Sequence, residues 1–313
     1  MKVLKKIPLA LILTLSGLAL KAQQDPMYTH YMDNTLVINP AYAGSRDALT
    51  VTGLYRSQWV NLKGAPIDQT ITMHAPVKSE HIGMGLSVSN DKIGPTNNTG
   101  IVVDFAYRMN LTKKSKLALG ISAGVNIFQA NLNTLQLDQQ YDPTFQNNIA
   151  NHITPNIGFG LYYSRERFYA GVSTSNLMQS KYSSITLANG NDLIAQEQRH
   201  YYLITGAMFN ITDNFAFKPT ALLKVTAAAP VELDITASFI IVKRLLLGAM
   251  FRTGDAVGAL VGFNITDQLH IGYSYDWSFA LKTSAYNQGS HEILLRYDFL
   301  FFDKKQVHSP RYF

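Results

Sequence analysis

One stretch of the chain has the residue pattern of a nucleophilic active site. Residues 120–124 read Gly-Ile-Ser-Ala-Gly, and a serine in this spacing is exposed for catalysis only on a tight turn from a strand into a helix. The flanking residues 117–119 and 125–128 continue one alternating strand, with no helical pattern after it. We therefore expect Ser122 to point inward from a strand as a structural residue, and we expect no enzymatic activity.

The histidines and glycines do not form a cofactor or metal pattern either. None of the eight histidines is paired with another at a metal-ligand spacing such as H-E-x-x-H. The glycine pairs at 83/85 and 158/160 lack the spacing and the following helix of a dinucleotide-binding motif, and small residues in curved barrel strands explain them better. We expect no metal and no cofactor.

Composition points away from a soluble domain. Charged residues make up 15% of the chain, below the roughly 25% of soluble domains, while the hydrophobic fraction of 47% is ordinary. After the N-terminus there is no apolar run of the length that a transmembrane helix needs. Low charge without added hydrophobicity favours alternating strands over membrane-spanning helices.

The first 22 residues have the features of a secretory signal peptide. Lys2, Lys5 and Lys6 form a basic region, an apolar stretch follows, and Ala22 ends the segment with a small residue. Its removal takes away four of the 27 Lys and Arg and none of the 21 acids, which leaves a net charge of +2. This small charge argues against nucleic acid as a partner. The chain has no cysteine and therefore no disulfide framework.

From residue 47 onward the sequence alternates apolar with small or polar residues in segments of about ten, each ended by turn residues, as a membrane β-barrel requires. The alternation is clearest in residues 231–239, 269–277 and 291–299. We predict an all-β fold, a transmembrane antiparallel β-barrel of about fourteen strands. The predicted strands are 47–57, 67–75, 82–90, 99–109, 116–128, 153–164, 167–176, 200–211, 214–226, 230–242, 244–252, 256–265, 268–279 and 290–300.

The connections between these strands support the count. The connections 91–98, 129–152, 177–199 and 280–289 all join an odd strand to an even one, whereas the even-to-odd connections 165–166, 212–213, 243 and 266–267 are tight turns. With the N-terminus in the periplasm, the longer set would face outside. A soluble β-sandwich also has short alternating strands, but the signal, the one-sided loops and the aromatic residues near strand ends favour the outer membrane of a Gram-negative bacterium.

Charged side chains on the inner face of the predicted barrel have two interpretations. They line a solvated pore, or some of them hydrogen-bond an internal plug. Both signs occur, which disfavours a strongly ion-selective channel. The positions are Asp104, Arg108, Lys218, Lys224, Glu232, Asp234, Glu292, Arg296 and Asp298.

Residues 23–46 fit neither the strand nor the helix period. Pro26 and Pro40 bias the residues before them toward extended or turn geometry. The three tyrosines argue against a mobile leader, because disordered segments are usually poor in aromatic residues. We expect this non-regular segment to lie in or under the lumen as a plug or docking segment, with its start in the periplasm.

The same stretch and the first hairpin resemble a known family. Residues 24–34 read QDPMYTHYMDN, residues 39–44 NPAYAG, residues 56–59 RSQW and residues 289–293 GSHEI. This pattern resembles the PorP/SprF family of Bacteroidetes type IX secretion membrane proteins over the whole mature chain, with His30 where members usually carry Gln. The residues that carry the motif are Asp25, Pro26, Tyr28, Tyr31, Asn34, Asn39, Pro40, Tyr42, Gly44, Arg56, Gln58 and Trp59.

The resemblance implies a non-enzymatic outer-membrane barrel of a Bacteroidetes-like bacterium that works with the type IX machinery. Members help to secrete partner proteins such as gliding adhesins, or retain them at the cell surface. The implied partners are outer-membrane lipid, a secreted or surface-anchored protein cargo and periplasmic type IX components.

The expected organisation is a signal peptide at 1–22, the motif segment at 23–46, the barrel at 47–302 and a tail at 303–313. Two other functions remain open from the residues: a passive diffusion porin or small-solute channel, and an outer-membrane hydrolase that uses Ser122.

Overall fold

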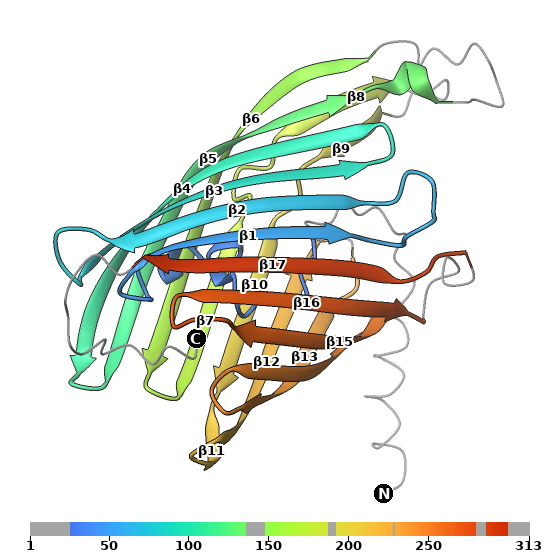
Figure 1. Cartoon of the computed structure of the whole chain (residues 1–313). Coiled ribbons are helices and arrows are strands. Elements are labelled where there is room, and N and C mark those ends of the chain that lie inside the picture. Colours follow the sequence, from blue (N-terminus) through green and yellow to red (C-terminus); the bar gives the residue numbers. More distant parts are fainter. Residues whose placement is uncertain (1–25, 136–147, 187–191, 228, 280–285, 300–313) are drawn as a thin grey trace, which may run out of the picture.

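The alternating segments of the sequence form the strands of one closed antiparallel barrel in a computed structural model (Figure 1). The structure describes residues 26–135, 148–186, 192–227, 229–279 and 286–299. The predicted signal peptide, Asp25 and the predicted C-terminal tail lie outside these residues.

The strands follow the predicted segments closely. Their bounds are β1 Leu49–Ser57, β2 Ile67–Pro76, β3 Ile82–Ile93, β4 Thr96–Thr112, β5 Ser115–Ala130, β6 Ile149–Arg165, β7 Phe168–Ser175, β8 Lys181–Thr186, β9 Asp192–Gln196, β10 His200–Ala207, β11 Phe209–Thr212, β12 Phe215–Thr226, β13 Glu232–Ile241, β14 Leu245–Arg252, β15 Ala256–Asn264, β16 Leu269–Ser278 and β17 Ser290–Phe299. Three 3-10 turns are also present, η2 Thr35–Val37, η3 Pro40–Tyr42 and η4 Leu132–Thr134.

The barrel contains fourteen strands, as predicted. β10 and β11 are two parts of one strand, interrupted at Met208, and both pair with β12. The ring closes through the pairs β7–β10 and β1–β17. β8 and β9 form a separate two-stranded hairpin that is not part of the barrel sheet.

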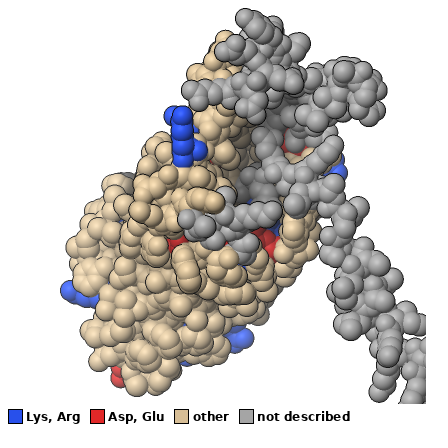
Figure 2. Space-filling view, turned by 90° about the vertical axis from the view of Figure 1, so that its right-hand side faces the viewer, with Lys and Arg blue, Asp and Glu red and all other residues tan. Residues whose placement is uncertain are grey.

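Alternation separates a lipid-facing surface from a polar lumen. In β16, Ile271, Tyr273 and Trp277 are exposed on the outer face, whereas Ser274 and Asp276 between them are buried inside. Figure 2 shows how few charged residues interrupt the otherwise uncharged surface of one face. The arrangement is the one expected of a barrel in lipid, where outward and inward positions alternate along each strand.

The connections differ from the sequence prediction in two places. The predicted connection 91–98 is almost wholly strand, because β3 continues to Ile93 and β4 begins at Thr96, so that only Gly94 and Pro95 form the turn. The predicted loop 177–199 contains the β8–β9 hairpin. Polar residues in both stretches had suggested loops, but strands that extend beyond the lipid can carry polar residues on both faces.

No helix of the described residues is long and apolar enough to cross a membrane.

A charge placed on the outer face should cost stability according to its depth. Ile235 lies on the outer face within β13 and is exposed, and Val231 lies just before the start of that strand. We expect Ile235→Arg to lower the free energy of unfolding by about 2–4 kcal/mol, and Val231→Arg by about 0–1 kcal/mol. Urea titration in lipid vesicles, followed by the heat-modifiable gel shift, measures both. Equal effects of the two substitutions would contradict the assignment of the lipid face.

Candidate functional site

Residues 26–46, called here the luminal segment, lie inside the barrel. Pro26 is beside Asp91 and Ile93, at the end of the barrel where the longer connections lie. The segment then descends to Asp47, which binds Arg108 near the opposite, short-turn end. The described segment therefore spans the lumen from the long-connection end downward, whereas the sequence had placed its start below the lumen.

The upper part of the segment is held by buried charges of the wall. The backbone N–H groups of Thr29 and His30 donate to the two carboxylate oxygens of Glu292 at 2.9 and 2.7 Å. Arg56 donates to Glu292 at 3.1 Å and to Asp276 at 2.7 Å. The hydroxyl of Thr29 donates to the same oxygen of Asp276 at 2.6 Å. We call these five residues the Glu292 cluster.

His30 adds a titratable group to the cluster. Its Nδ1 lies 2.8 Å from Oε1 of Glu292, and its side chain is 2% exposed. Burial alone would lower the pKa of His30, but the hydrogen bond and the negative charge of Glu292 outweigh burial and raise it. The Asp33 and Asp276 carboxylates add to the rise. Nδ1 of His30 thus faces the Glu292 carboxylate, whereas Nε2 has no hydrogen-bond partner among the described residues.

A second group of charges holds the middle of the segment. Asp33 lies 3.9 Å from the ammonium of Lys218 and 3.4 Å from the guanidinium of Arg296. Burial would raise the pKa of Asp33, but the two cations hold it well below its usual range. The next residue, Asn34, accepts a hydrogen bond of 2.8 Å from Thr72 through its side-chain oxygen. An ionised Asp33 thus neutralises part of the positive charge on the wall.

Two tyrosines hydrogen-bond threonines of the wall. The hydroxyl of Tyr28 lies 2.8 Å from that of Thr70, and the hydroxyl of Tyr31 lies 3.0 Å from that of Thr220. Burial raises the pKa of Tyr31 to about 12. Both phenols are therefore neutral at physiological pH and satisfied by the wall, while their rings pack in the lumen.

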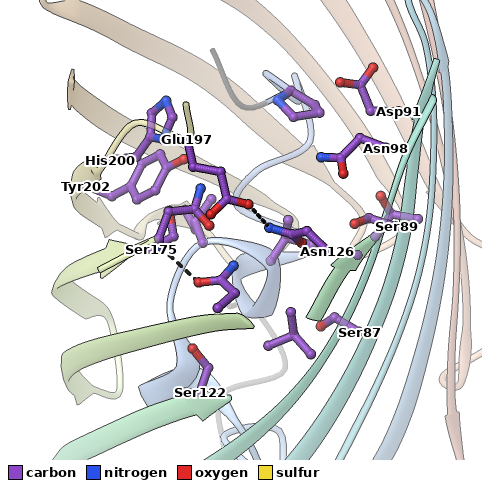
Figure 3. A pocket seen from close by; sticks show the side chains of 18 of the residues that line it. Ser87, Ser89, Asp91, Asn98, Ser122, Asn126, Ser175, Glu197, His200 and Tyr202 are labelled. Atoms are coloured by element: carbon purple, nitrogen blue, oxygen red, sulfur yellow. Dashed lines mark hydrogen bonds between the residues drawn. The ribbon is translucent and has the colours of Figure 1, made fainter. Parts of the chain in front are cut away.

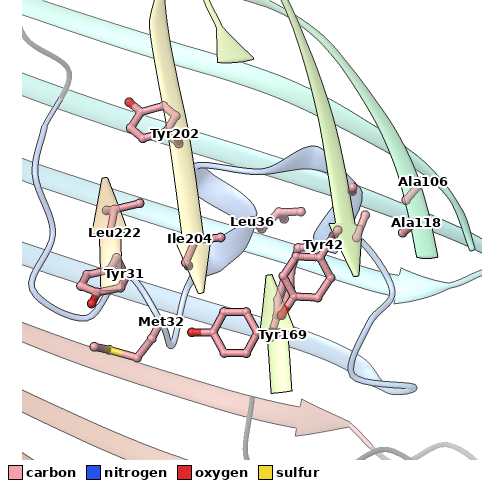
Figure 4. Close-up of a cluster of buried hydrophobic side chains, with 13 residues drawn as sticks. Tyr31, Met32, Leu36, Tyr42, Ala106, Ala118, Tyr169, Tyr202, Ile204 and Leu222 are labelled. Carbon is pink, nitrogen blue, oxygen red and sulfur yellow. The ribbon is translucent and has the colours of Figure 1, made fainter. Parts of the chain in front are cut away.

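Tyr42 belongs to a buried apolar cluster in the lower lumen (Figure 4). Its ring meets the rings of His74 and Tyr162 edge-on, with centroids 5.3 and 5.4 Å apart. Such contacts add to the free energy gained by burial of apolar surface. The cluster joins the segment to wall residues of several strands, among them Ala106, Ala118, Tyr169, Ile204 and Leu222.

Asn39 fixes the turn that contains η3. Its side-chain oxygen accepts the N–H of Ala41 at 2.9 Å, and Pro40 follows at the first position of the turn. Its amide nitrogen donates to the carbonyl of Leu161 at 3.0 Å and to that of Val172 at 3.4 Å. One side chain thus caps the turn and binds strands β6 and β7.

Glycines in the wall allow the segment to approach the strands closely. A Cβ atom on Gly120 would lie 2.1 Å from the backbone nitrogen of Ala41, and one on Gly160 would lie 2.1 Å from Oδ1 of Asn39. Real Cβ atoms essentially never approach so closely, so both positions need glycine. Strand curvature, the reason expected from the sequence, does not account for Gly160.

The lower end of the segment is tied to the wall by two arginines. Arg108 donates to the carbonyl of Gly44, whose φ of +73° is the left-handed region that glycine adopts freely, and to Asp47 at 2.9 Å. Arg46 forms an ion pair of 2.9 Å with Asp298. These contacts lie where the segment turns into β1.

Other residues named from the sequence do not bind the segment in this way. Gln58 donates to Asp68 at 2.9 Å, and the backbone N–H of Trp59 donates to the hydroxyl of Ser290, both at the long-connection end. Glu232 and Asp234 bind Arg252, which reaches Asp234 at 2.9 Å. Lys224 is buried and lies opposite Glu232 in the β12–β13 register. Asp104 lines an upper cavity.

Sequence reasoning missed Arg252 and Asp276 as partners. Both lie on the inner face of their strands, so the alternation that identified the other charges could have found them. Ser122 lies on the inner side of β5, which continues past it to Ala130 with no helix. Among the described residues, no three His, Asp or Glu side chains gather as metal ligands would.

An antiparallel barrel with an apolar outer face and a polar lumen is a β-barrel protein of the outer-membrane type. The model of the family described as "Type IX secretion system membrane protein PorP/SprF" matches residues 20–297. The chain belongs to this family, and is thus a membrane component of the type IX secretion system located in the outer membrane.

Two solved structures match the chain at low sequence identity. The outer membrane protein Omp33 of Acinetobacter baumannii is 13% identical, and the match covers 82% of this chain and 100% of that one with a TM-score of 0.47. The CymD monoaromatic hydrocarbon channel is 9% identical, and the match covers 85% of this chain and 92% of that one with a TM-score of 0.49. No curated protein matches the chain.

A side chain at Gly120 should displace the segment without opening the barrel. We expect Gly120→Val to expose residues 26–46, because the new side chain would overlap the backbone at Ala41. Since the chain has no cysteine, Met32→Cys provides a single probe, and its labelling by a maleimide measures exposure. Gly53→Val is the matched control, because a Cβ there meets nothing within 4 Å. Equal labelling in both variants would contradict the packing described.

Retention of the segment should weaken as pH rises. The pKa of His30 is raised in the folded state. The stabilisation that protonated His30 gives is therefore fully present below about pH 6.5, the usual pKa of histidine. This stabilisation is lost as the pH rises through the higher pKa of the folded state. Because the thiolate fraction of any cysteine rises with pH, the rate is divided by that of a chain with Tyr286→Cys, an exposed position, and we expect this ratio for Met32→Cys to increase with pH. His30→Gln should remove this dependence, and a persistent dependence in that variant would assign it to another group.

Proposed function

We propose that the protein supports the secretion or the cell-surface anchoring of a partner protein, such as an adhesin, and that the luminal segment acts as a plug or docking element in this role. The role is non-enzymatic. The family membership supports a place in the type IX secretion system, and the proposal adds what the barrel does there.

The observation that carries the proposal is the Glu292 cluster. In an open channel, charges of the wall face water and passing solutes. Here Glu292, Arg56 and Asp276 are at most 2% exposed and bind the segment and one another. Buried charges are stable only when each has its partners, so a wall of this kind suits a lumen that is filled.

The longer connections supply the surface for cargo in this proposal. The connections predicted at 129–152 and 177–199 join β5 to β6 and β7 to β10, at the same end of the barrel as Pro26. If that end faces outside, as the loop lengths indicate, an exported protein meets these loops and the top of the luminal segment together. The short-turn end would then face the periplasmic components of the system.

The diffusion porin is the alternative that the same geometry disfavours. A barrel of this size can hold a water-filled channel, but the luminal segment occupies the space between an upper and a lower cavity. The hydrolase alternative finds no support around Ser122, since β5 provides none of the strand-to-helix geometry that such a nucleophile requires.

Substitution of two segment residues should abolish cargo display. We expect the double variant Tyr31→Ala and Asn39→Ala to insert as a heat-modifiable barrel but to lose surface display of the partner, because the segment loses hydrogen bonds to β6, β7 and β12. Labelling of intact cells with an antibody against the displayed protein measures the loss. The matched control is Tyr107→Ala with Asn110→Ala, two exposed residues of β4.

Normal display by the segment variant would refute the proposal. Conductance in planar bilayers gives the same experiment a second readout: the intact protein should be closed, and a variant without residues 23–44 should conduct. Steady conductance by the intact protein would favour the porin.

A further inference from the structure

A cavity of about 280 Å3 lies above residues 36–40 of the luminal segment and is also lined by Pro26 and Tyr28, at the end of the barrel with the longer connections (Figure 3). Leu36 to Ile38 and Pro40 close its lower end, and inward residues of β3 to β7 and β10 form its sides. Its size is near the lower limit of small-molecule pockets, which is about 300 Å3. It therefore admits a small group or the end of a chain, but not a folded protein segment.

The lining is rich in hydroxyl and carboxamide groups. Six of these side chains are Ser87, Ser89, Asn98, Ser122, Asn126 and Asn156. Asp91, Asp104 and Glu197 are the carboxylates, and none of the described lining residues is Lys or Arg. Such a lining offers both hydrogen-bond donors and acceptors and repels anions.

Several polar atoms of this lining have no partner among the described residues. They are Oγ of Ser87, Oδ1 of Asn98 and Oδ2 of Asp104. Ser87 and Asp104 are only 9% and 2% exposed. By contrast, Glu197 accepts hydrogen bonds from Asn126 at 2.7 Å and Thr154 at 3.0 Å. Buried polar groups are normally paired, so the three atoms indicate contacts that a ligand can complete.

The three groups lie at different depths along one wall. Their depths follow from the β3–β4 register. Asn98, opposite Asp91, lies nearest the opening, Ser87, opposite Val102, lies deeper, and Asp104, opposite Gly85, lies nearest the floor. Figure 3 shows Asn98, Ser89 and Ser87 following one another in this direction. The ligand that meets all of them is therefore elongated and enters by one end.

Aromatic rings face this polar wall from the other side. Tyr202 and His200 of β10 lie opposite Ser87 and Ser89 in Figure 3, and their rings are stacked with centroids 6.2 Å apart and an angle of 17° between the planes. Phe128 also lines the cavity. The cavity thus combines hydrogen-bonding groups along one side with aromatic side chains on another.

We infer that this cavity binds the end of an uncharged glycan chain. Each sugar hydroxyl both donates and accepts, which matches hydroxyl, carboxamide and carboxylate groups. The C–H face of a sugar ring needs apolar contact, which the small exposed parts of Tyr202 and Phe128, each 7% exposed, supply. An acidic glycan would meet the carboxylates of Asp91 and Glu197 with no Lys or Arg among the described lining residues, and an apolar ligand would leave Asn98 and Asp104 without partners. The assignment does not depend on the proposed role in secretion.

Binding to an array of neutral and acidic oligosaccharides, with the purified full chain in detergent, tests the inference. We expect neutral oligosaccharides to bind and oligogalacturonate to bind more weakly or not at all. Two sources of such a glycan exist at a cell surface, outer-membrane lipid and surface protein. Competition by delipidated sugar chains and by glycopeptides, each prepared from the same cells, distinguishes them.

Substitution of the unpartnered groups locates the site. The double variant Ser87→Ala and Asn98→Leu should bind the best neutral oligosaccharide about tenfold or more weakly, since two hydrogen bonds are lost. Asn110→Leu, an exposed residue of β4 beside the lower cavity, should bind normally. Both variants should show the heat-modifiable shift of the unchanged protein.

A second measurement covers the case in which the double variant does not fold. In a chain changed only by Ser89→Cys, the bound oligosaccharide should protect the new thiol from maleimide. The inference is overturned if no neutral oligosaccharide binds at millimolar concentration, if binding survives the double substitution in a folded barrel, or if only a lysine- or arginine-rich peptide binds.

Discussion

The carboxylate of Glu292 is the interaction on which the arrangement of the lumen depends. It accepts two backbone N–H groups of the luminal segment and a hydrogen bond from Arg56, and it is wholly buried. Because a buried charge without partners is costly, Glu292 stabilises the occupied lumen and destabilises an empty one. Asp33 repeats the arrangement with the signs reversed, as an anion of the segment between cations of the wall. The segment and the wall are therefore complementary in charge.

The luminal segment and the wall are also complementary in shape. Gly120 and Gly160 leave room where Ala41 and Asn39 approach the strands, and Tyr42 fills the lower lumen where the wall supplies rings. Above this level the packing ends, and the lining becomes polar and incompletely paired. The lumen thus has a lower part filled by the chain itself and an upper part in which the segment leaves a cavity open.

The sequence predicted the strands well because lipid on one side and polar groups on the other impose a period of two on each of them. In β13 and β16 the alternation alone assigned the inner and outer faces. The stretch 91–98 was predicted wrongly because its polar residues resemble a loop. The contacts of the luminal segment had no local signal: Thr29 and Glu292 are 263 positions apart, and only the closure of the barrel brings them together. Arg252 and Asp276 were missed because the pattern shows which face a charge occupies but not which charge it meets.

The position of Glu292 on the last strand has a consequence for assembly. The luminal segment precedes every strand, yet its partner carboxylate is placed only when β17 pairs with β1. A register slip by one residue would turn Glu292 toward lipid and Ile293 toward the lumen. The segment can therefore be fully bound only in a barrel whose first and last strands have joined in the correct register. Occupancy of the lumen therefore marks the completed ring, and it stabilises the pairing of β1 with β17.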